Sequence, residues 1–285
     1  MAGGVSAPPV FPCEVLLVNI SVLIPSRGRP EGLARCVKSM ALKVSGKHNV
    51  QYVIGCDGDD LPTIGIALGL RGEGLPVIPS VAARQPTLGG LTNMLAEKHP
   101  ADVYVTWGDD FRVLTDGWDD AIADAWAAKP DGVWWWRCVP QVTLAIISEK
   151  WRAAAGRIYT DYFPFWYDDI WLIEVLRYAT GSTTCYPVEA WIKDGAAATH
   201  RMRDLAFWDD FFWSRRDERK AQARRIAERL GWPVVTDLTG LDVERATDFD
   251  AAAIEAKQGD KRPPTAEYMA ALERAKSLME QREAA

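Results

Sequence analysis

The sequence predicts an α/β fold in which helices flank a mixed, mainly parallel sheet. Runs of β-branched residues alternate with amphipathic helical patterns through the first half of the chain, and two of these runs end directly in acidic turns. The composition agrees with this class, because 48% hydrophobic and 25% charged residues are ordinary proportions for a soluble globular protein. It excludes a disordered chain, a collagen-like fibre and a small scaffold held by disulfides.

The first half contains the clearest alternation of strands and helices. Residues 15–24 are rich in β-branched side chains, and Pro30 then begins a helical pattern with Leu33, Val37 and Met40 on one side. The other expected strands are residues 50–56, 75–78 and 102–107, and the other expected helices are residues 89–99 and a segment capped by Thr115 or Asp116 that runs to about residue 128. This order favours parallel strands joined by helices.

The second half has a different pattern, which ends in helices. We expect strands at residues 133–139, 142–148 and 183–188, a helix at 167–178, one long helix at 207–230, and a last helix at 265–283. Residues 212–229 carry seven Lys or Arg against three Asp or Glu, so the long helix has a basic face. We therefore expect a main domain over residues 1–204 and a helical C-terminal extension over residues 205–285 packed on it.

The charge and cysteine content limit the partners and the compartment. A net charge of -6 excludes a wholesale basic coat for nucleic acid, although a local basic patch remains compatible with it. The five cysteines are scattered and never form a C-x-x-C pair, which is typical of reduced thiols in a cytosolic protein. No apolar stretch is long enough to cross a bilayer, so we expect a cytoplasmic protein with no stable membrane insertion.

Tryptophan is the one unusual component. Twelve of the 13 tryptophans lie between Trp107 and Trp213. Flat aromatic faces suit sugar rings and nucleobases, whereas a Trp-rich core is the equally weighted alternative. The run at residues 134–136 would alternate faces on a strand, so at least one of its rings is a candidate for exposure.

Two acidic turns follow expected strands, and we interpret them as the ligand edge of the sheet. One contains Asp57, Asp59 and Asp60, and the other contains Asp109 and Asp110. In open α/β sheets, ligands bind at the carboxyl ends of the strands. Carboxylates there suit Mg²⁺ or Mn²⁺ that itself holds a diphosphate. The alternative is that Asp simply favours turns after strands.

Four segments together resemble the GT-A-type glycosyltransferases of the family 2 kind. ISVLIPSRGRPEGLARCVKSM resembles their opening strand and helix, and VIGCDGDD resembles the second strand with its acidic end. PTLGGLTNMLAEKHPADVYVTWGDDFRVLTDGWDDAI resembles the helix, strand, D-x-D-type turn and helix that follow, and WYDDIWLIEV resembles the later acidic motif. The resemblance covers roughly residues 18–200 and implies a GT-A (Rossmann-like) fold.

The resemblance implies a metal-dependent hexosyltransferase-like enzyme that moves a sugar from a nucleotide-sugar, most simply a UDP-sugar, to an acceptor hydroxyl. It places Asp169 as the general base of an inverting reaction, with Asp168 as its support or as the nucleophile of a retaining route. Asp110 and His200 would hold Mn²⁺ or Mg²⁺. The donor would lie against Pro25, Arg27, Arg29, Asp57, Arg84, Asn93 and Asp109. This chain has Gly-Asp-Asp in place of Asp-x-Asp and Asp168 where Glu is usual, which leaves open the essential Asp of each pair.

The acceptor is open between two classes. Trp166 and Trp171 flank the expected base and are candidates to stack on an acceptor, and Arg215 and Arg216 begin the basic face. A glycan would use the aromatic rings, whereas a hydroxymethylated pyrimidine in DNA, such as that of a phage genome, would also use the basic face for its phosphates. The alternative from another class is a non-catalytic module that binds sugar or nucleic acid on a degenerate transferase fold.

Overall fold

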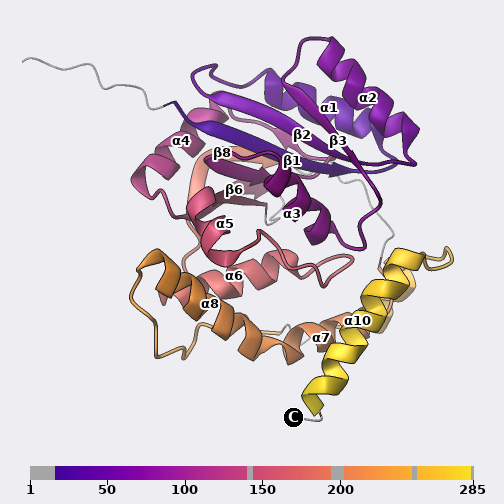
Figure 1. Ribbon diagram of the computed structural model, residues 1–285, viewed down its shortest axis with the longest axis vertical. Helices are drawn as coiled ribbons and strands as arrows, with labels where there is room; N and C mark the ends of the chain where they lie inside the picture. Colours follow the sequence, from indigo (N-terminus) through magenta and orange to yellow (C-terminus); the bar gives the residue numbers. More distant parts are fainter. Residues whose placement is uncertain (1–16, 140–143, 194–201, 246–248, 284–285) are drawn as a thin grey trace, which may run out of the picture.

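The computed structural model describes residues 17–139, 144–193, 202–245 and 249–283 (Figure 1). Within these ranges, eight strands form one sheet in the order β3-β2-β1-β4-β7-β6-β8-β5. The strands are β1 (Asn19–Ser26), β2 (Asn49–Asp57), β3 (Val77–Ala82), β4 (Val103–Thr106), β5 (Arg112–Val113), β6 (Val133–Val139), β7 (Ala145–Ser148) and β8 (Pro187–Lys193). The helices are α1 (Pro30–Ala41), α2 (Leu61–Gly72), α3 (Leu88–Lys98), α4 (Trp118–Ala128), α5 (Glu149–Ala155), α6 (Asp168–Thr180), α7 (Leu205–Ser214), α8 (Arg216–Leu230), α9 (Ala251–Gln258) and α10 (Ala266–Glu283).

The sheet is mixed and mainly parallel, which confirms the expected fold class. Strand β1 pairs in parallel with β2 and β4, and β2 pairs in parallel with β3. Strand β7 runs antiparallel to both β4 and β6, so β6 and its parallel partner β8 point the same way as β4. The carboxyl ends of β1, β2, β3, β4, β6 and β8 therefore lie at one edge of the sheet.

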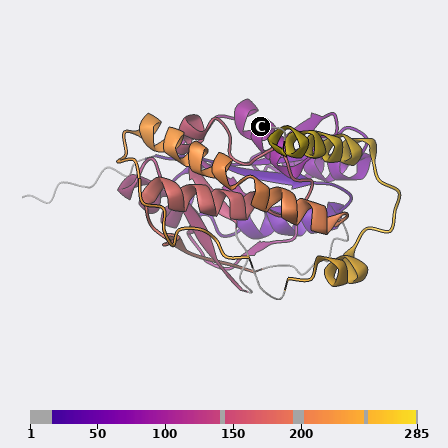
Figure 2. The same cartoon turned by 90° about the horizontal axis from the view of Figure 1, so that it is seen from below.

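Helices cover both faces of the sheet and enclose two apolar clusters. Leu33 of α1, Leu70 of α2 and Ile122 of α4 belong to the cluster on one face. The other cluster is larger, because behind α3, α5 and α6 it continues into α7, α8 and α10. The view at right angles (Figure 2) shows α6 and α8 side by side over the sheet. No helix within the described ranges combines the length and the apolar character that crossing a bilayer requires.

Most tryptophans are core residues, as the alternative interpretation expected. Trp134, Trp135 and Trp136 are all buried, so the idea that this strand exposes a ring is wrong. The strand alternates faces as expected, but each face is covered: Trp135 joins the larger cluster, while its two neighbours join the other one.

The long helix expected at residues 207–230 is wrong, because the chain forms two helices that meet at Arg215. Arg215 has φ -95° and ψ 17°, outside helical geometry. The carbonyl of Phe212 accepts from the backbone N–H of Arg215 at 3.1 Å and from the Arg219 guanidinium at 2.6 Å. The side chain of Arg219 thus replaces a helical hydrogen bond at the junction.

Two strands have other boundaries than the sequence predicts, and three helices lie where the sequence predicts none. The strands expected at 75–78 and 183–188 lie at Val77–Ala82 and Pro187–Lys193. Helices α2, α5 and α9 are additions; α2 has glycines inside it, which weakens its helical pattern. The start of α2 nonetheless has the residue types that favour a helix start. The Asp60 side chain accepts from the backbone N–H of Thr63, and a proline follows in the first turn.

The helices after residue 204 share a core with the rest of the chain. Helix α8 packs on α5 and α6, and residues of α7, α8 and α10 belong to the same apolar cluster as the sheet residues Leu23 and Val53. The domain boundary at residue 204 stays a prediction.

Candidate functional site

The chain segments after β1, β2 and β4 meet at the carboxyl edge of the sheet. We call this region the donor edge and define it by Arg27, Arg29, Asp57, Asp109 and Asp110. The parallel register that aligns Ser26 with Cys56, and Leu23 with Thr106, brings these segments side by side. The Ser26 hydroxyl donates to the Asp109 carboxylate at 2.7 Å, which fixes the loop after β4 against the end of β1.

Arg27 neutralises the acidic turn after β2. Its guanidinium donates to Asp57 at 2.8 Å and to both carboxylate oxygens of Asp59 at 2.5 and 2.9 Å. These hydrogen bonds lower the pKa of Asp59 to about 2. The third acid, Asp60, accepts from the backbone N–H of Gly28 at 2.7 Å and begins α2. The first acidic turn is thus tied to the loop after β1, and half-buried Pro25 lies at the base of that loop.

The second acidic turn holds two carboxylates around one guanidinium. One nitrogen of Arg29 lies 2.8 Å from an Asp110 oxygen and 3.2 Å from an Asp109 oxygen. Gly108 makes this turn possible, since a Cβ at that position would come within 2.8 Å of the Asp110 carboxylate. The turn therefore offers hard oxygen ligands at a fixed place on the edge of the sheet.

These carboxylates have the chemistry that Mg²⁺ or Mn²⁺ requires, with Arg29 as a cation that already shares them. Within the described ranges, no group of three or more His, Cys, Asp and Glu side chains is gathered as a metal site. His200 lies outside the described residues. Asp109 and Asp110 offer two carboxylates of the kind that a divalent ion binds, which is fewer ligands than a complete site needs.

The two aspartates of the later acidic motif begin α6. They follow Trp166 and Tyr167, whose φ values of 52° and 63° are left-handed, a strained conformation for aromatic residues. The Asp168 carboxyl is buried and accepts from the Thr160 hydroxyl at 2.7 Å. Burial raises the pKa of Asp168 well above its ordinary range. Asp169 is half-buried, and its side chain accepts from the N–H of Ile170 at 2.8 Å.

A buried tyrosine connects this pair to the end of β4. The Tyr159 hydroxyl lies 2.9 Å from the hydroxyl of Thr106, the last residue of β4. Burial raises the pKa of Tyr159, and the nearby charges of Asp169 and Asp168 raise it further. The paired aspartates therefore lie close to the strand that leads into Asp109 and Asp110.

Asn93 does not lie at the donor edge with the other expected donor residues. Its side-chain amide donates to the Tyr159 carbonyl at 2.8 Å, and its oxygen accepts from the N–H groups of Ile158 and Tyr159 at 2.9 and 3.1 Å. Its polar groups are thus occupied by the chain that leads to the paired aspartates. Arg84 follows β3, and its nearest acid is Glu267 of α10 at 3.8 Å.

The two aromatic acceptor candidates differ. Trp166 exposes 46% of its surface, whereas Trp171 exposes 2% and donates to Gln222 at 2.8 Å. Trp171 is therefore unavailable for stacking, because its position in the first turn of α6 points it into the core. Trp166 remains accessible beside the paired aspartates.

Several of the seven cations expected on the basic face of the long helix have acidic partners. Arg215 pairs with Glu218 at 2.5 Å, and Arg216 lies 3.6 Å from Asp242. Arg219 is fully buried against Glu174 of α6, so its expected part in a phosphate-binding face is wrong. Arg219 lies on the inner side of α8 together with the apolar Ala223 and Ile226.

Solved structures with the same fold share little sequence with this chain. The protein TarS of S. aureus, residues 1–349, matches 74% of this chain and 71% of its own, with TM-score 0.52 and 11% identity. Its complex with UDP matches with TM-score 0.52 and 13% identity over 74% of this chain and 70% of that one. A mannosyltransferase from Pyrobaculum calidifontis in complex with GDP-Man and Mn²⁺ matches 77% of this chain and 72% of its own, with TM-score 0.50 and 11% identity. No protein-family model matches the sequence, and no curated protein matches it.

Proposed function

We propose that the chain is a metal-dependent glycosyltransferase that uses a nucleotide-sugar, with a UDP-sugar as the first candidate. One observation carries the proposal: Asp109 and Asp110 follow β4, and Asp168 is linked to Thr106 at the end of β4 through the hydrogen bonds of Thr160 and the neighbouring Tyr159. Glycosyl transfer needs these two functions on either side of the sugar, since a cation must meet the leaving diphosphate and a base must meet the acceptor hydroxyl. The fold shared with complexes of UDP and of GDP-Man with Mn²⁺ supports this assignment.

The donor edge would bind the nucleotide and its diphosphate. Arg27 and Arg29 follow the end of β1, and both already hold carboxylates that a diphosphate would replace or share. A divalent ion bound by Asp110 and Asp109 would neutralise the charge that develops on the leaving diphosphate. Arg84 lies after β3, and we assign it to the outer end of the donor site.

Asp169 is the proposed general base. The acceptor oxygen forms a bond to the anomeric carbon as the bond from that carbon to the diphosphate oxygen breaks, and the acceptor proton passes to Asp169. Asp168 is less suited to the same step because it is buried and already accepts a hydrogen bond from the Thr160 hydroxyl. We assign Asp168 to supporting the loop beneath the base, and a single displacement with inversion follows.

A glycan is the favoured acceptor. Trp166 presents an exposed aromatic face beside Asp169, as a sugar ring requires. DNA would use the seven cations of the expected basic face for its phosphates, and three of them, Arg215, Arg216 and Arg219, are paired with acids, the last of them buried. Transfer to DNA containing hydroxymethylated pyrimidines, in place of glycans, would reverse this choice.

A thermal-shift experiment tests the donor half of the proposal. We expect UDP or a UDP-sugar to stabilise the protein in the presence of Mn²⁺, by about 2.7 kcal/mol at a ligand concentration 100 times its Kd. The change Asp110→Asn should abolish the metal-dependent part, whereas Asp116→Asn, which alters an exposed acid paired with Lys43, should preserve it. If no nucleoside diphosphate or nucleotide-sugar stabilises the protein with either metal, the proposal fails. If nucleotide binds but neither glycan nor DNA receives a sugar, the binding-module alternative replaces it.

A further inference from the structure

The chain between α5 and α6, which we call the base loop (residues 156–167), has no regular structure and leads directly into the paired aspartates. Helix α3 holds its first part. Asn93 bonds to the backbone of Ile158 and Tyr159, and the start of α3 is so close that a Cβ on Gly89 would lie 1.8 Å from the Thr160 carbonyl. The loop position thus depends on helices far away in the sequence.

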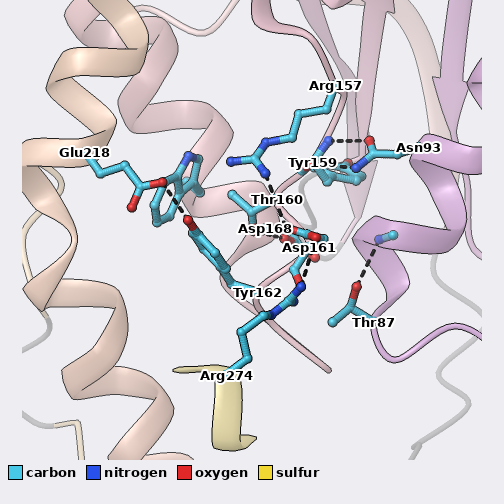
Figure 3. Close-up of polar contacts among 12 residues, drawn as sticks. Thr87, Asn93, Arg157, Tyr159, Thr160, Asp161, Tyr162, Asp168, Glu218 and Arg274 are labelled. Atoms are coloured by element: carbon cyan, nitrogen blue, oxygen red, sulfur yellow. Dashed lines mark hydrogen bonds and ion pairs between the residues drawn. The ribbon is translucent and has the colours of Figure 1, made fainter. Parts of the chain in front are cut away.

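Helix α10 holds the middle of the base loop. Arg274 contacts Asp161 twice: one nitrogen lies 3.1 Å from a carboxylate oxygen, and the other donates to the backbone carbonyl (Figure 3). The second carboxylate oxygen of Asp161 accepts from Arg157 at 3.2 Å. The guanidinium of Arg274 also lies over the Tyr162 ring, 5.9 Å from its centroid. A side chain that binds both the carboxylate and the backbone of one residue restrains position and orientation together.

The residue before Asp161 makes the contact that reaches the paired aspartates. Thr160 donates its hydroxyl to the Asp168 carboxyl at 2.7 Å. Restraining the Asp161 backbone therefore restrains Thr160, which in turn fixes Asp168 at the first turn of α6. Because this turn also carries Asp169, a shift of the base loop would move the proposed base.

We propose that Arg274 is a positioning residue of the active site, acting through Asp161 and Thr160 on Asp168 and on the neighbouring base. The inference rests on the proposed function for the identity of the base. It makes α10 a part of the catalytic architecture, in addition to its packing role on α7. In the first turn of the same helix, Glu267 lies 3.8 Å from Arg84, which follows β3. Seven residues, or about two turns, separate Glu267 from Arg274, so both lie on one side of α10.

The matched pair Arg274→Gln and Lys276→Gln tests the proposal. Both changes remove one exposed cation from α10, but the ion pair of Lys276 is with Glu273 of its own helix, at 2.9 Å. We expect Arg274→Gln to lower kcat about 10- to 100-fold with the donor KM unchanged within about twofold, because misplacement of a base affects the chemical step. Lys276→Gln should match the wild type in both constants.

Hydrogen exchange gives a readout that does not require turnover. In Arg274→Gln, the backbone amides of the base loop should exchange faster, whereas those of β1 and β2 should be unchanged. Asp161→Asn should reproduce the effect, and the double variant should add little, because the two residues share one interaction. If Arg274→Gln lowers the melting temperature strongly, Arg274→Lys, which keeps the charge but loses the double contact, replaces it in both measurements.

The outcomes separate the two proposals. A wild-type protein that transfers sugar, with an Arg274→Gln variant of equal kcat and equal base-loop exchange, overturns this inference and leaves the proposed function standing. A wild-type protein that transfers no sugar to any glycan or DNA acceptor overturns the proposed function. A rise in donor KM with kcat unchanged also overturns the inference, since it would assign Arg274 to donor binding.

Discussion

The donor edge and the base loop both have contacts at the end of β4, but they are positioned in different ways. At the donor edge, each charged side chain lies at the end of a strand or shortly after it, and parallel register alone brings the segments together. The base loop is held by residues distant in the sequence: Asn93 is 66 positions from Tyr159, and Arg274 is 113 positions from Asp161. Charged side chains on one side of a site can thus be positioned by local chain order, whereas those on the other side are positioned by tertiary packing.

The largest effect is expected from a change that disables the base side and spares the donor edge. Asp169→Asn should lower kcat by about 10²- to 10⁴-fold, the usual contribution of a positioned general base. Stabilisation by UDP with Mn²⁺ should be retained, because Asp169 lies outside the donor edge. Single-turnover transfer together with thermal shift measures both effects. Full transfer activity in the variant would show that another group accepts the proton.

The second effect concerns how much a buried ion pair and an exposed ion pair each contribute to the free energy of unfolding. Arg219→Met leaves the fully buried Glu174 carboxylate without its partner and should cost about 3–5 kcal/mol of unfolding free energy. Lys38→Gln breaks the exposed pair with Glu73 beside α1 and should cost under about 1 kcal/mol. Urea unfolding of both variants measures the contrast. Equal costs would mean that the pair between α6 and α8 does not stabilise the base side.

The smallest effect is a pH dependence confined to the base side. Because the pKa of Asp168 is raised in the folded protein, its contribution to stability is complete below the ordinary pKa of an aspartate and is lost as the pH rises towards the raised value. Asp168→Asn carries no such group, so its stability relative to the wild type should increase between pH 4 and pH 7. Urea unfolding across this range tests the sign. A constant difference between the two proteins would show that Asp168 ionises normally.

The same contrast explains what the sequence could predict. The acidic turns at Asp57 and Asp110 were found from sequence because each follows a β-branched run, and parallel strands place such ends at one edge. The contact of Asn93 with the base loop and the part played by Arg274 were not found. Both depend on how helices pack, and neither residue type nor spacing shows which loop a distant helix will touch.

The basic segment of the C-terminal part shows how such a pattern misleads. Counting charges along residues 212–229 suggested one cationic face, but composition carries no information on burial. The structure turns Arg219 inward to Glu174 and breaks the helix at Arg215. An arginine at helical spacing with Ala223 and Ile226 is the signal that could have placed it on the inner side of α8.

The distance in sequence between Asp161 and Arg274 also has a consequence for biosynthesis. A ribosome that adds about 5–20 residues per second needs roughly 6–23 s to proceed from one to the other, since 113 positions separate them. Over that interval, the strands of the donor edge can already pair, whereas the base loop lacks one of its anchors. A nascent chain would therefore complete the strand pairing at the donor edge before the base loop gains its contact with α10.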